Sequence, residues 1–558
     1  MSDQGSELVF LPLGGVGEIG MNLGLYGFGP PHAKRWLMVD CGVTFADQRI
    51  NPGIDLVLPD IAFIEEERDD LLGIILTHAH EDHYGALLDL WPRLEVPVYA
   101  TRFTAGLLRA KAIENGKKIY PDVHIVEQGE TLDLDPFRVE LIAVSHSIPE
   151  PNALAIGSPA GTIIHSGDWK IDPTPGVGQP IDLDRFKALG EGGILAMMSD
   201  STNAGRAGHS PSEADVAASL KAVVAEAPER VAVTAFSSNV ARIKAVFEAA
   251  MANDRHVVVM GRAMRRVIGV ATECGFMDGL PAPLSEDDFG HLPRDKVLVL
   301  LTGSQGEERA ALARIANDDH PRIALSAGDK VVFSSRTIPG NEKPVNAVVN
   351  GLTQQGIEVV TDQEALVHTS GHPRREELKE MYELLRPKVL VPVHGDPMHL
   401  SAQAALAREA GIEQVVVTEN GKMVRLAPGP AEIVDEVLTD VLLLDGRLLR
   451  TPQDANVRER RALAFAGMVT AMVSLDDRFE LDEDPEVVMI GVPAVDDDGD
   501  EFRDALIDAV EGAVDSIPRH RRRDRDVVAK AARRAIRAHM AQRWGKKPIC
   551  HVFVATAG

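Results

Sequence analysis

A seven-residue segment, Thr77–His83, carries three histidines and two carboxylates directly after an apolar, strand-like run. It has the pattern H-x-H-x-D-H. On an extended segment the side chains at i and i+2 point the same way, so His78 and His80 can bind one cation. A turn after these two histidines would let Asp82 and His83 face a second cation nearby.

Imidazole and carboxylate are ligands of Zn²⁺ and Mn²⁺, and a pair of such ions is typical of hydrolytic enzymes. The alternative is a polar loop with incidental histidines. We favour metal binding, because a half-buried cluster this dense needs a cation to offset its desolvation. The segment therefore predicts a two-metal hydrolytic site.

Composition narrows the class of protein. The 558 residues suffice for about two to four domains, and the net charge of −26 argues against indiscriminate binding of polyanions through a basic surface. The cysteines Cys41, Cys274 and Cys550 form no C-x-x-C motif, which favours a reducing compartment. Residues 1–7 lack the features of a signal peptide, and no apolar run approaches the roughly 18 residues of a membrane span. We expect a cytoplasmic protein without membrane association.

Near the N-terminus, Gly15–Gly20 fits the pattern G-x-G-x-x-G, and Asp40 lies twenty residues beyond its last glycine. This spacing mimics a dinucleotide-binding fingerprint, which requires a helix after the glycines. Residues 21–39 contain three glycines and a Pro-Pro pair, so they cannot form that helix. We expect strand, turn and strand instead. The glycines would let the backbone approach a ligand site closely, and Asp40 would orient a histidine ligand from behind.

Further metal ligands are expected at the ends of other strands, because a sheet delivers side chains to one rim. Three candidates, His146, Asp168 and His394, each follow an apolar, strand-like run. Any one of them alone is equally consistent with a structural residue. Three at matching positions favour a shared site, in which the two oxygens of Asp168 could bridge both metals.

These residues, in this order, resemble the motifs of the metallo-β-lactamase superfamily. The resemblance implies an α/β fold, with an αββα sandwich of two sheets flanked by helices. It also implies two divalent ions per subunit, zinc first, with manganese or magnesium as alternatives. One ion would be held by His78, His80, His146 and Asp168, and the other by Asp82, His83, Asp168 and His394.

His394 lies 226 positions after Asp168, and a segment of this length is too long for a loop and must contain a domain of its own. Helical patterns alternate there with apolar strands, which indicates a parallel α/β sheet. This arrangement resembles the β-CASP insertion, which marks the branch of the superfamily that processes nucleic acids. Asp200 and His372 match the motifs of that insertion.

Polar clusters at strand ends inside the insertion indicate a phosphate-binding groove. Hydroxyl groups, small residues and backbone N–H groups, with one arginine, suit an anionic backbone. For any single cluster, ordinary loop chemistry such as helix capping is an equal alternative. The candidates inside the insertion are Ser237, Ser238, Asn239, Gly303, Ser304, Gln305, Ser335 and Arg336. Just beyond it, the candidates are His368, Thr369, Ser370, Gly371 and His372.

Within this branch, nearly the whole chain resembles the bacterial ribonuclease J family. Asp396 stands where we expect a glutamate, but that position is not a metal ligand in the family pattern. The segments that carry the resemblance are Gly14–Asn22, His78–His83, Ser145–Glu150, Gly167–Lys170 and Pro392–Gly395.

We expect a metallo-β-lactamase domain in two parts, 1–207 and 361–450, around a β-CASP domain at 208–360, followed by a linker and C-terminal domain at 451–558. The last segment shows strand patterns at 466–473 and 549–554 and helix patterns at 502–514 and 527–543, typical of a small α+β domain. By resemblance this domain is implicated in assembly. For its basic run His520–Arg525 we favour a solvated helix start or ion pairing between subunits over RNA contact, because its neighbours include acidic residues.

The resemblance implies a ribonuclease of RNA maturation and decay. It would cut 5′→3′ from 5′-monophosphate ends, with some internal cleavage, through a hydroxide generated between two metals. Asp82 would belong to the catalytic group. His372 would stabilise the transition state or protonate the leaving 3′ oxygen, and Asp200 would orient either His372 or a metal ligand. Two alternatives are a small-molecule hydrolase of thioesterase or lactamase type, disfavoured by the insertion, and an inactive RNA-degradation scaffold, disfavoured because every ligand position is filled.

The expected partners follow from this interpretation. They are an RNA substrate, further copies of the chain in a homodimer or homotetramer, and components of an RNA-degradation complex.

Overall fold

The computed structural model describes residues 5–338, 340–453 and 455–556. Residues 1–4, part of the segment 1–7 considered above as a signal peptide, lie outside the described residues. The chain divides into two compact units. The first comprises the residues up to Thr44 together with Leu58–Asp440, and the second comprises Phe45–Val57 together with the residues from Val441 onward. In the described chain, no helix combines the length and apolar character that crossing a membrane requires.

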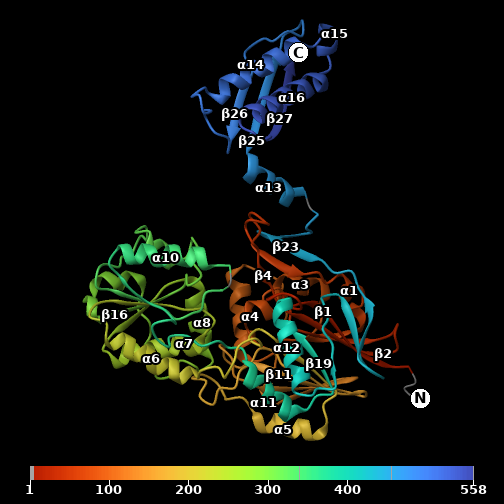
Figure 1. Ribbon diagram of the computed structural model, residues 1–558, viewed down its shortest axis with the longest axis vertical. Coiled ribbons are helices and arrows are strands. Elements are labelled where there is room, and N and C mark those ends of the chain that lie inside the picture. The colour runs from red at the N-terminus through yellow and green to blue at the C-terminus, as the bar shows by residue number, and fades with distance from the viewer. Residues whose placement is uncertain (1–4, 339, 454, 557–558) are drawn as a thin grey trace. The chain divides into compact units, whose positions relative to one another are not determined.

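Two large sheets form the centre of the first unit (Figure 1). The eight-stranded sheet has the order β22 (Glu432–Glu436), β21 (Lys422–Ala427), β1 (Glu7–Gly14), β2 (Leu23–Gly29), β3 (Arg35–Val39), β6 (Leu71–Ile75), β7 (Val98–Ala100) and β8 (Val123–Ile125). The seven-stranded sheet has the order β20 (Gln414–Val415), β19 (Val389–Val393), β13 (Ala196–Asp200), β12 (Gly161–His165), β11 (Asn152–Ser158), β10 (Phe137–Ala143) and β9 (Thr131–Leu134).

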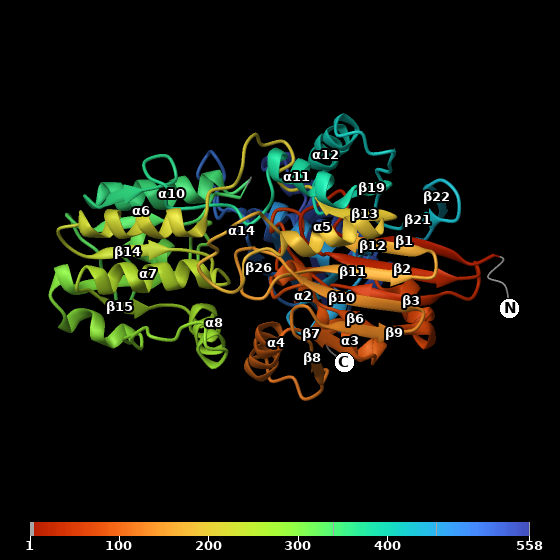
Figure 2. The same ribbon diagram turned by 90° about the horizontal axis from the view of Figure 1, so that it is seen from below.

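The two sheets pack face to face, with helices on their outer sides (Figure 2). Leu8, Tyr26 and Leu37 of one sheet share a single buried cluster with Leu141 and Val391 of the other. A second cluster lies between the outer face of the seven-stranded sheet and three helices, α5 (Leu183–Gly192), α11 (Arg375–Leu385) and α12 (Pro397–Glu409). The predicted αββα sandwich is therefore confirmed. Its helices are α1 (Ala62–Glu66), α2 (Glu81–Tyr84), α3 (Leu87–Leu94), α4 (Arg102–Glu114), α5 (Leu183–Gly192), α11 (Arg375–Leu385) and α12 (Pro397–Glu409), with the short 3₁₀ helix η1 (Arg68–Asp70).

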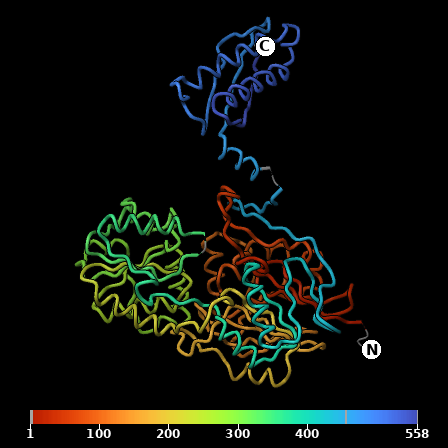
Figure 3. Tube along the Cα trace, viewed as in Figure 1, coloured from red at the N-terminus to blue at the C-terminus, as the bar shows by residue number. Residues whose placement is uncertain are grey.

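Between β13 and α11 the chain leaves the sandwich and forms a five-stranded sheet, as the colour change in Figure 3 shows. All neighbouring strands in it are parallel, as the alternation of strands and helices predicts. The order is β15 (His256–Val259), β16 (Val297–Leu301), β14 (Val231–Thr234), β17 (Lys330–Phe333) and β18 (Glu358–Val360). The accompanying helices are α6 (Glu213–Ala225), α7 (Val240–Ala252), α8 (Arg262–Glu273), α9 (Ala311–Ala316) and α10 (Glu342–Gln354), with η2 (Glu286–His291) and η3 (Arg294–Lys296).

The second unit contains a three-stranded sheet whose inner face packs on two helices. The two predicted strands and two predicted helices are all present as β25 (Met468–Leu475), α14 (Phe502–Asp515), α16 (Arg525–Arg543) and β27 (Ile549–Thr556). The structure adds β26 (Glu486–Ile490) and α15 (Arg519–Arg522), which were not predicted. Upstream of them lies α13 (Ala455–Ala466). A separate four-stranded sheet has the order β24 (Leu448–Arg450), β23 (Val441–Asp445), β5 (Leu56–Pro59) and β4 (Thr44–Phe45).

The glycine-rich segment after β1 is a turn between two antiparallel strands, so the prediction that no dinucleotide-binding helix follows it is confirmed. Close backbone approach explains the first glycines. A Cβ on Gly14 would lie 1.9 Å from the carbonyl oxygen of Met21, and a Cβ on Gly15 would lie 2.3 Å from Oδ1 of Asn22. Gly15 also has a φ of +83°, a conformation that strongly favours glycine.

Candidate metal centre

Strand ends of both sheets meet at one rim of the sandwich. The histidine cluster follows β6, His146 follows β10, Asp168 follows β12, and His394 follows β19. The carboxyl ends of β12, β13 and β19 lie side by side because these three strands are parallel neighbours. This topology brings together residues more than 300 positions apart: Nε2 of His394 lies 3.3 Å from Oδ2 of Asp82.

The first group of ligands is His78, His80, His146 and Asp168. Nδ1 of His80 lies 3.1 Å from Nε2 of His78 and 3.0 Å from Nε2 of His146. Oδ2 of Asp168 lies 3.7 Å from Nε2 of His78 and 3.6 Å from Nε2 of His146. Nitrogen atoms 3 Å apart on separate rings are the spacing expected of donors around one ion with metal–nitrogen bonds of about 2.0–2.1 Å.

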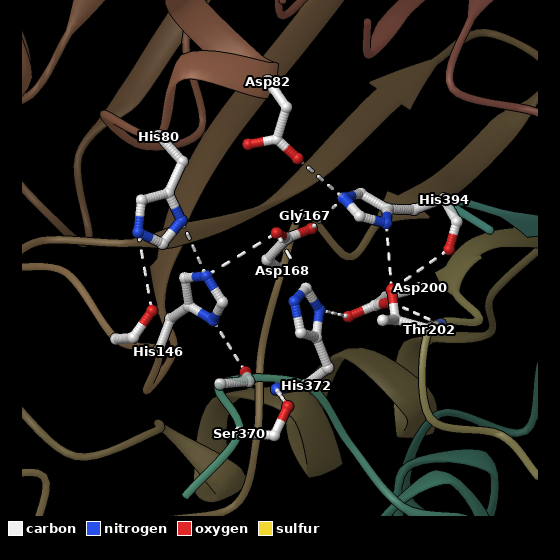
Figure 4. Close-up of polar contacts among 12 residues, drawn as sticks. His80, Asp82, His146, Gly167, Asp168, Asp200, Thr202, Ser370, His372 and His394 are labelled. Atoms are coloured by element: carbon white, nitrogen blue, oxygen red, sulfur yellow. Dashed lines mark hydrogen bonds and ion pairs between the residues drawn. The ribbon is translucent and has the colours of Figure 1, made fainter. Parts of the chain in front are cut away.

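The second group is Asp82, His83, Asp168 and His394 (Figure 4 shows all but His83 by label). Nε2 of His83 lies 3.2 Å from Oδ2 of Asp168 and 3.7 Å from Oδ2 of Asp82. Nε2 of His394 lies 3.5 Å from Oδ1 of Asp168. Three of these four residues are buried, and only Asp82 is partly exposed.

Asp168 is shared by both groups. Its side chain is 2 % exposed, and its Oδ1 atom has no hydrogen-bond partner among the described residues. A buried carboxylate oxygen without a partner is costly unless a cation or a donor satisfies it. The residues present therefore fit two metal ions bridged by this carboxylate.

The histidines of the first group are in the neutral form that binds a metal ion. Burial, followed by the charge of neighbouring histidines, holds the pKa of His78 and of His146 well below the usual histidine range. Burial also lowers the pKa of His80 to about 4. All three rings are thus neutral at pH 7 and offer lone pairs, as a divalent ion requires.

In the second group of ligands, the effect of the carboxylates on the histidine pKa values is larger than the effect of burial. Burial disfavours the imidazolium form, but the charge of Asp168 and the hydrogen bond of Asp82 outweigh it and raise the pKa of His394 to about 9. The pKa of His83 is raised for the same kind of reason, by Asp168, Asp82 and Asp40 against burial. Without metal, protons on these rings neutralise the carboxylates. A bound cation would take over that task and release the protons.

Hydrogen bonds orient the histidine ligands through the ring nitrogen that faces away from the metal site. Nδ1 of His83 lies 2.7 Å from Oδ2 of Asp40, a carboxylate that also accepts from the backbone N–H and the hydroxyl of Thr77. Nδ1 of His394 lies 2.9 Å from the hydroxyl of Thr202, and Nδ1 of His146 donates to the carbonyl oxygen of Gly371 at 2.7 Å. Such partners fix the ring orientation and the nitrogen offered to a metal.

Asp200 and His372 form a pair at the edge of the centre. Nδ1 of His372 lies 2.7 Å from Oδ2 of Asp200, which is fully buried at the end of β13. Burial disfavours the charged ring, but the carboxylates of Asp200 and Asp168 raise the pKa of His372 above the ordinary histidine value. The hydroxyl of Ser370 accepts from the backbone N–H of His372 at 3.3 Å and shapes this turn (Figure 4).

The candidate phosphate-binding residues divide into two sets. In the first, side chains are already engaged: Oδ1 of Asn239 caps α7, Oε1 of Gln305 accepts from the backbone N–H of Ile338, and the hydroxyl of Thr369 donates to the carbonyl oxygen of Pro211. Ser370 also accepts from Nδ2 of Asn203.

In the second set, polar groups stand without partners. The hydroxyl of Ser335 and Nδ1 of His368 are buried and make no hydrogen bond to a described residue, while Arg336 is exposed. Burial lowers the pKa of His368 to about 3, and the charges of Arg242 and Arg336 act in the same direction. No hydrogen bond joins the side chains of Ser237 or Ser238 to a described residue.

Arg242 was missed by sequence reasoning. Its guanidinium is fully buried and donates to the carbonyl oxygens of Ser334 and Val367 and to Oε2 of Glu213, at 3.0, 2.8 and 2.9 Å. It thereby fastens the end of β17 to the loop that leads to His372. An arginine within an apolar helix pattern is the one signal that the sequence offered.

A second missed pair is Tyr26 and His165. The hydroxyl of Tyr26 lies 2.7 Å from Nδ1 of His165, and burial lowers the pKa of that ring to about 4. Both residues lie in strands whose apolar pattern predicts only core packing. His165 lines a small cavity behind the ligands together with Asn22, Asp40, His83 and Asp168.

Four family models match the chain in succession. Residues 25–234 match the metallo-beta-lactamase superfamily, 228–352 the beta-CASP domain of ribonuclease J, 356–417 the Zn-dependent metallo-hydrolase RNA specificity domain, and 455–557 the ribonuclease J C-terminal domain.

Comparison with known proteins agrees with these matches. Ribonuclease J of Sinorhizobium meliloti is 55 % identical over 99 % of this chain and 98 % of its own length. Ribonuclease J of Corynebacterium glutamicum is 37 % identical over 96 % of this chain and 74 % of its own. Among solved structures, a protein of unknown function from Enterococcus faecalis shares the fold, with a TM-score of 0.53 and 16 % identity over 75 % of this chain and all of its own. The fold, the donor clusters and these similarities together show that the chain belongs to the ribonuclease J family of RNA-specific metallo-hydrolases of the metallo-β-lactamase superfamily.

Proposed function

We propose that the chain hydrolyses RNA at a centre of two divalent ions, zinc in the first instance with manganese or magnesium as substitutes. The observation that carries this proposal is the convergence of two donor groups on Asp168, whose buried Oδ1 atom has no hydrogen-bond partner among the described residues. His78, His80 and His146 would hold one ion with Asp168. Asp82, His83 and His394 would hold the other with the same carboxylate.

When bound, the two ions supply a water of lowered pKa and offset the charge that develops on the phosphate. The protein supplies the remaining steps. Asp82, whose side chain is 30 % exposed, would orient the attacking water on the open side of the centre. His372, kept protonated by Asp200, donates a proton to the leaving 3′ oxygen.

We further propose that the enzyme degrades RNA in the 5′→3′ direction from 5′-monophosphate ends and also cleaves internally to a lesser extent. Two buried polar atoms, the hydroxyl of Ser335 and Nδ1 of His368, make no hydrogen bond to a described residue and support an anion site near Arg336. Hydroxyl, imidazole and guanidinium groups are suited to a terminal phosphate. The engaged side chains of Asn239, Gln305 and Thr369 would shape this site rather than contact the phosphate.

The test is digestion of one RNA sequence bearing a 5′-monophosphate, a 5′-triphosphate or a 5′-hydroxyl, with the products resolved by length. The proposal predicts mononucleotides released in order from the monophosphate end, and slower release from the other two ends. Arg336→Gln should remove most of the preference for monophosphate and leave cleavage of 5′-hydroxyl RNA unchanged. Arg309→Gln, which removes another arginine of the insertion, is the matched control.

Two results contradict this proposal separately. Equal release from all three ends would rule out the phosphate site but leave the exonuclease direction standing. Internal fragments alone would rule out the direction. Hydrolysis of a thioester or lactam in place of RNA would favour a small-molecule hydrolase.

We also propose a cytoplasmic homodimer or homotetramer that works with partners of an RNA-degradation complex. The match to the ribonuclease J C-terminal domain supports assembly, and the three cysteines are unpaired, which suits a reducing compartment. The five-stranded sheet, whose strands fall within residues 231–360, supports the proposed domain limits 1–207, 208–360, 361–450 and 451–558.

A further inference from the structure

Basic residues are concentrated in one stretch of the second unit. The chain carries a net charge of −26, yet residues 519–547 contain twelve lysines and arginines and only two acidic residues. The question is which of these cations are already neutralised within the fold, because paired cations are unavailable to a partner.

Several of them are paired. Arg519 contacts Glu480, Arg522 is buried and lies 3.6 Å from Asp515, and Arg543 contacts Asp496. The basic run that the sequence singles out, His520–Arg525, is therefore partly committed to contacts inside this unit.

A different set is free. Lys530, Arg533, Arg534 and Arg537 are exposed, and none of their side chains makes a hydrogen bond or an ion pair to any residue in the described part of the chain. All four lie on α16, whose opposite face packs into the core through Val528, Ala532, Ile536 and Met540. We call these four cations the α16 stripe.

The stripe is compact. At 3.6 residues per turn, its four positions fall within about 100° of the helix circumference and about 11 Å along the axis. Four unpaired cations at this spacing repel one another, which a helix surface normally relieves with i, i+4 acidic partners. The first acidic side chain of α16 is Asp526 and the helix has no other, so the charge is left for something outside the unit.

We propose that the α16 stripe is a second RNA-binding surface, distinct from the metal centre, which contacts the phosphate backbone of the substrate. A polyanion is complementary to this stripe, and the chain acts on RNA. Because the rest of the protein is strongly acidic, long-range repulsion opposes capture of RNA, and a local cationic strip would offset it. The inference rests on RNA being the substrate but not on the direction of cleavage or on the phosphate site.

The test compares two full-length variants of equal charge. The stripe variant is K530Q/R533Q/R534Q/R537Q, since glutamine preserves helix propensity. The control variant is R447Q/R458Q/R478Q/R503Q, which removes four exposed arginines of the same unit whose side chains have no partner among the described residues. Binding of a fluorescent 40-nucleotide RNA is measured in EDTA at several salt concentrations, so that cleavage plays no part, and molecular mass is measured by light scattering.

For the stripe variant we expect Kd to rise at least tenfold at low salt and the slope of log Kd against log salt to fall by about 2 to 3, since each phosphate contact contributes about 0.7 on a single strand. Cleavage of a tetranucleotide with metal restored should be unchanged. Unaltered affinity in the stripe variant, or an equal loss in the control, would overturn the proposal. A change in molecular mass with the loss of affinity would also overturn it and assign the stripe to contact between copies of the chain.

Discussion

His372 donates its Nδ1 proton to Oδ2 of Asp200 across 2.7 Å, although the two residues lie 172 positions apart. Asp200 ends a strand of the sandwich, whereas His372 belongs to the loop by which the chain returns from the insertion. The proton donor that we propose for the leaving group is thus assembled only when the insertion is folded against the sandwich. Nε2 of His372 makes no hydrogen bond to a described residue and remains available to substrate.

Asp200→Asn should shift the pH dependence of RNA cleavage. The carboxylate raises the pKa of His372, so the acid form is present below that raised pKa and is lost as pH rises through it. Without the negative charge the pKa falls, and the alkaline limb of kcat/KM moves to lower pH. We expect a loss of about 10²- to 10⁴-fold at pH 8, the range typical of general acids.

The matched control is Asp182→Asn, an equivalent change at the N-cap of α5, where asparagine caps as well as aspartate. A pH profile of Asp200→Asn that coincides with that of the control would contradict the proposed role of the pair.

Asp40→Asn should weaken one metal site and spare the other. Asp40 has a φ of +63°, which asparagine also tolerates, so the change removes charge without backbone strain. Asp40 contacts His83 of the second donor group directly, whereas it reaches His78 of the first group only through the hydroxyl of Thr77. Loss of a direct support typically costs about 10- to 100-fold in metal affinity.

The measurement is the zinc content per chain after dialysis against a graded series of chelator concentrations. We expect Asp40→Asn to lose one ion at low chelator concentration and to retain the other. Asp47→Asn, at an aspartate that pairs with Arg49 on the surface, should behave as the unchanged protein. Loss of both ions together from Asp40→Asn would refute independent support of the two sites.

Glu213→Gln should destabilise the insertion. The pair Arg242–Glu213 is buried at 0 % and 3 % exposure, and removal of one partner leaves an uncompensated charge, at a cost of about 3–5 kcal/mol. Because Arg242 also holds the carbonyl oxygen of Val367, activity should fall with stability.

Thermal unfolding is the measurement. Glu380→Gln removes an exposed partner of His209 and should cost less than about 1 kcal/mol. Equal melting temperatures for the two variants would show that the buried pair does not hold the loop.

The sequence predicts the candidate metal ligands that lie at strand ends. The pattern H-x-H-x-D-H and the residues His146, Asp168 and His394 all follow apolar runs, and runs of this kind are readable because burial imposes a local periodicity. The insertion was predictable for a related reason, since 226 positions cannot form a loop.

What the sequence does not predict are contacts fixed by long-range packing. Thr202 faces His394 only because β13 and β19 are parallel neighbours. In the second unit, the backbone N–H of Asp55 donates to the carbonyl oxygen of Leu444, which no local pattern reveals. The free arginines of α16 were likewise hidden, since a sequence shows which charges are near in the chain and not which are paired.

If Asp168 joins two metal ions in one centre, its replacement should weaken both sites at once. Native mass spectrometry of zinc-reconstituted protein tests it most directly, with Asp168→Ala compared with the unchanged chain and with Asp182→Asn. We expect two zinc ions per chain in the unchanged protein and in the control, and fewer than one in Asp168→Ala. Two ions retained by Asp168→Ala would contradict it.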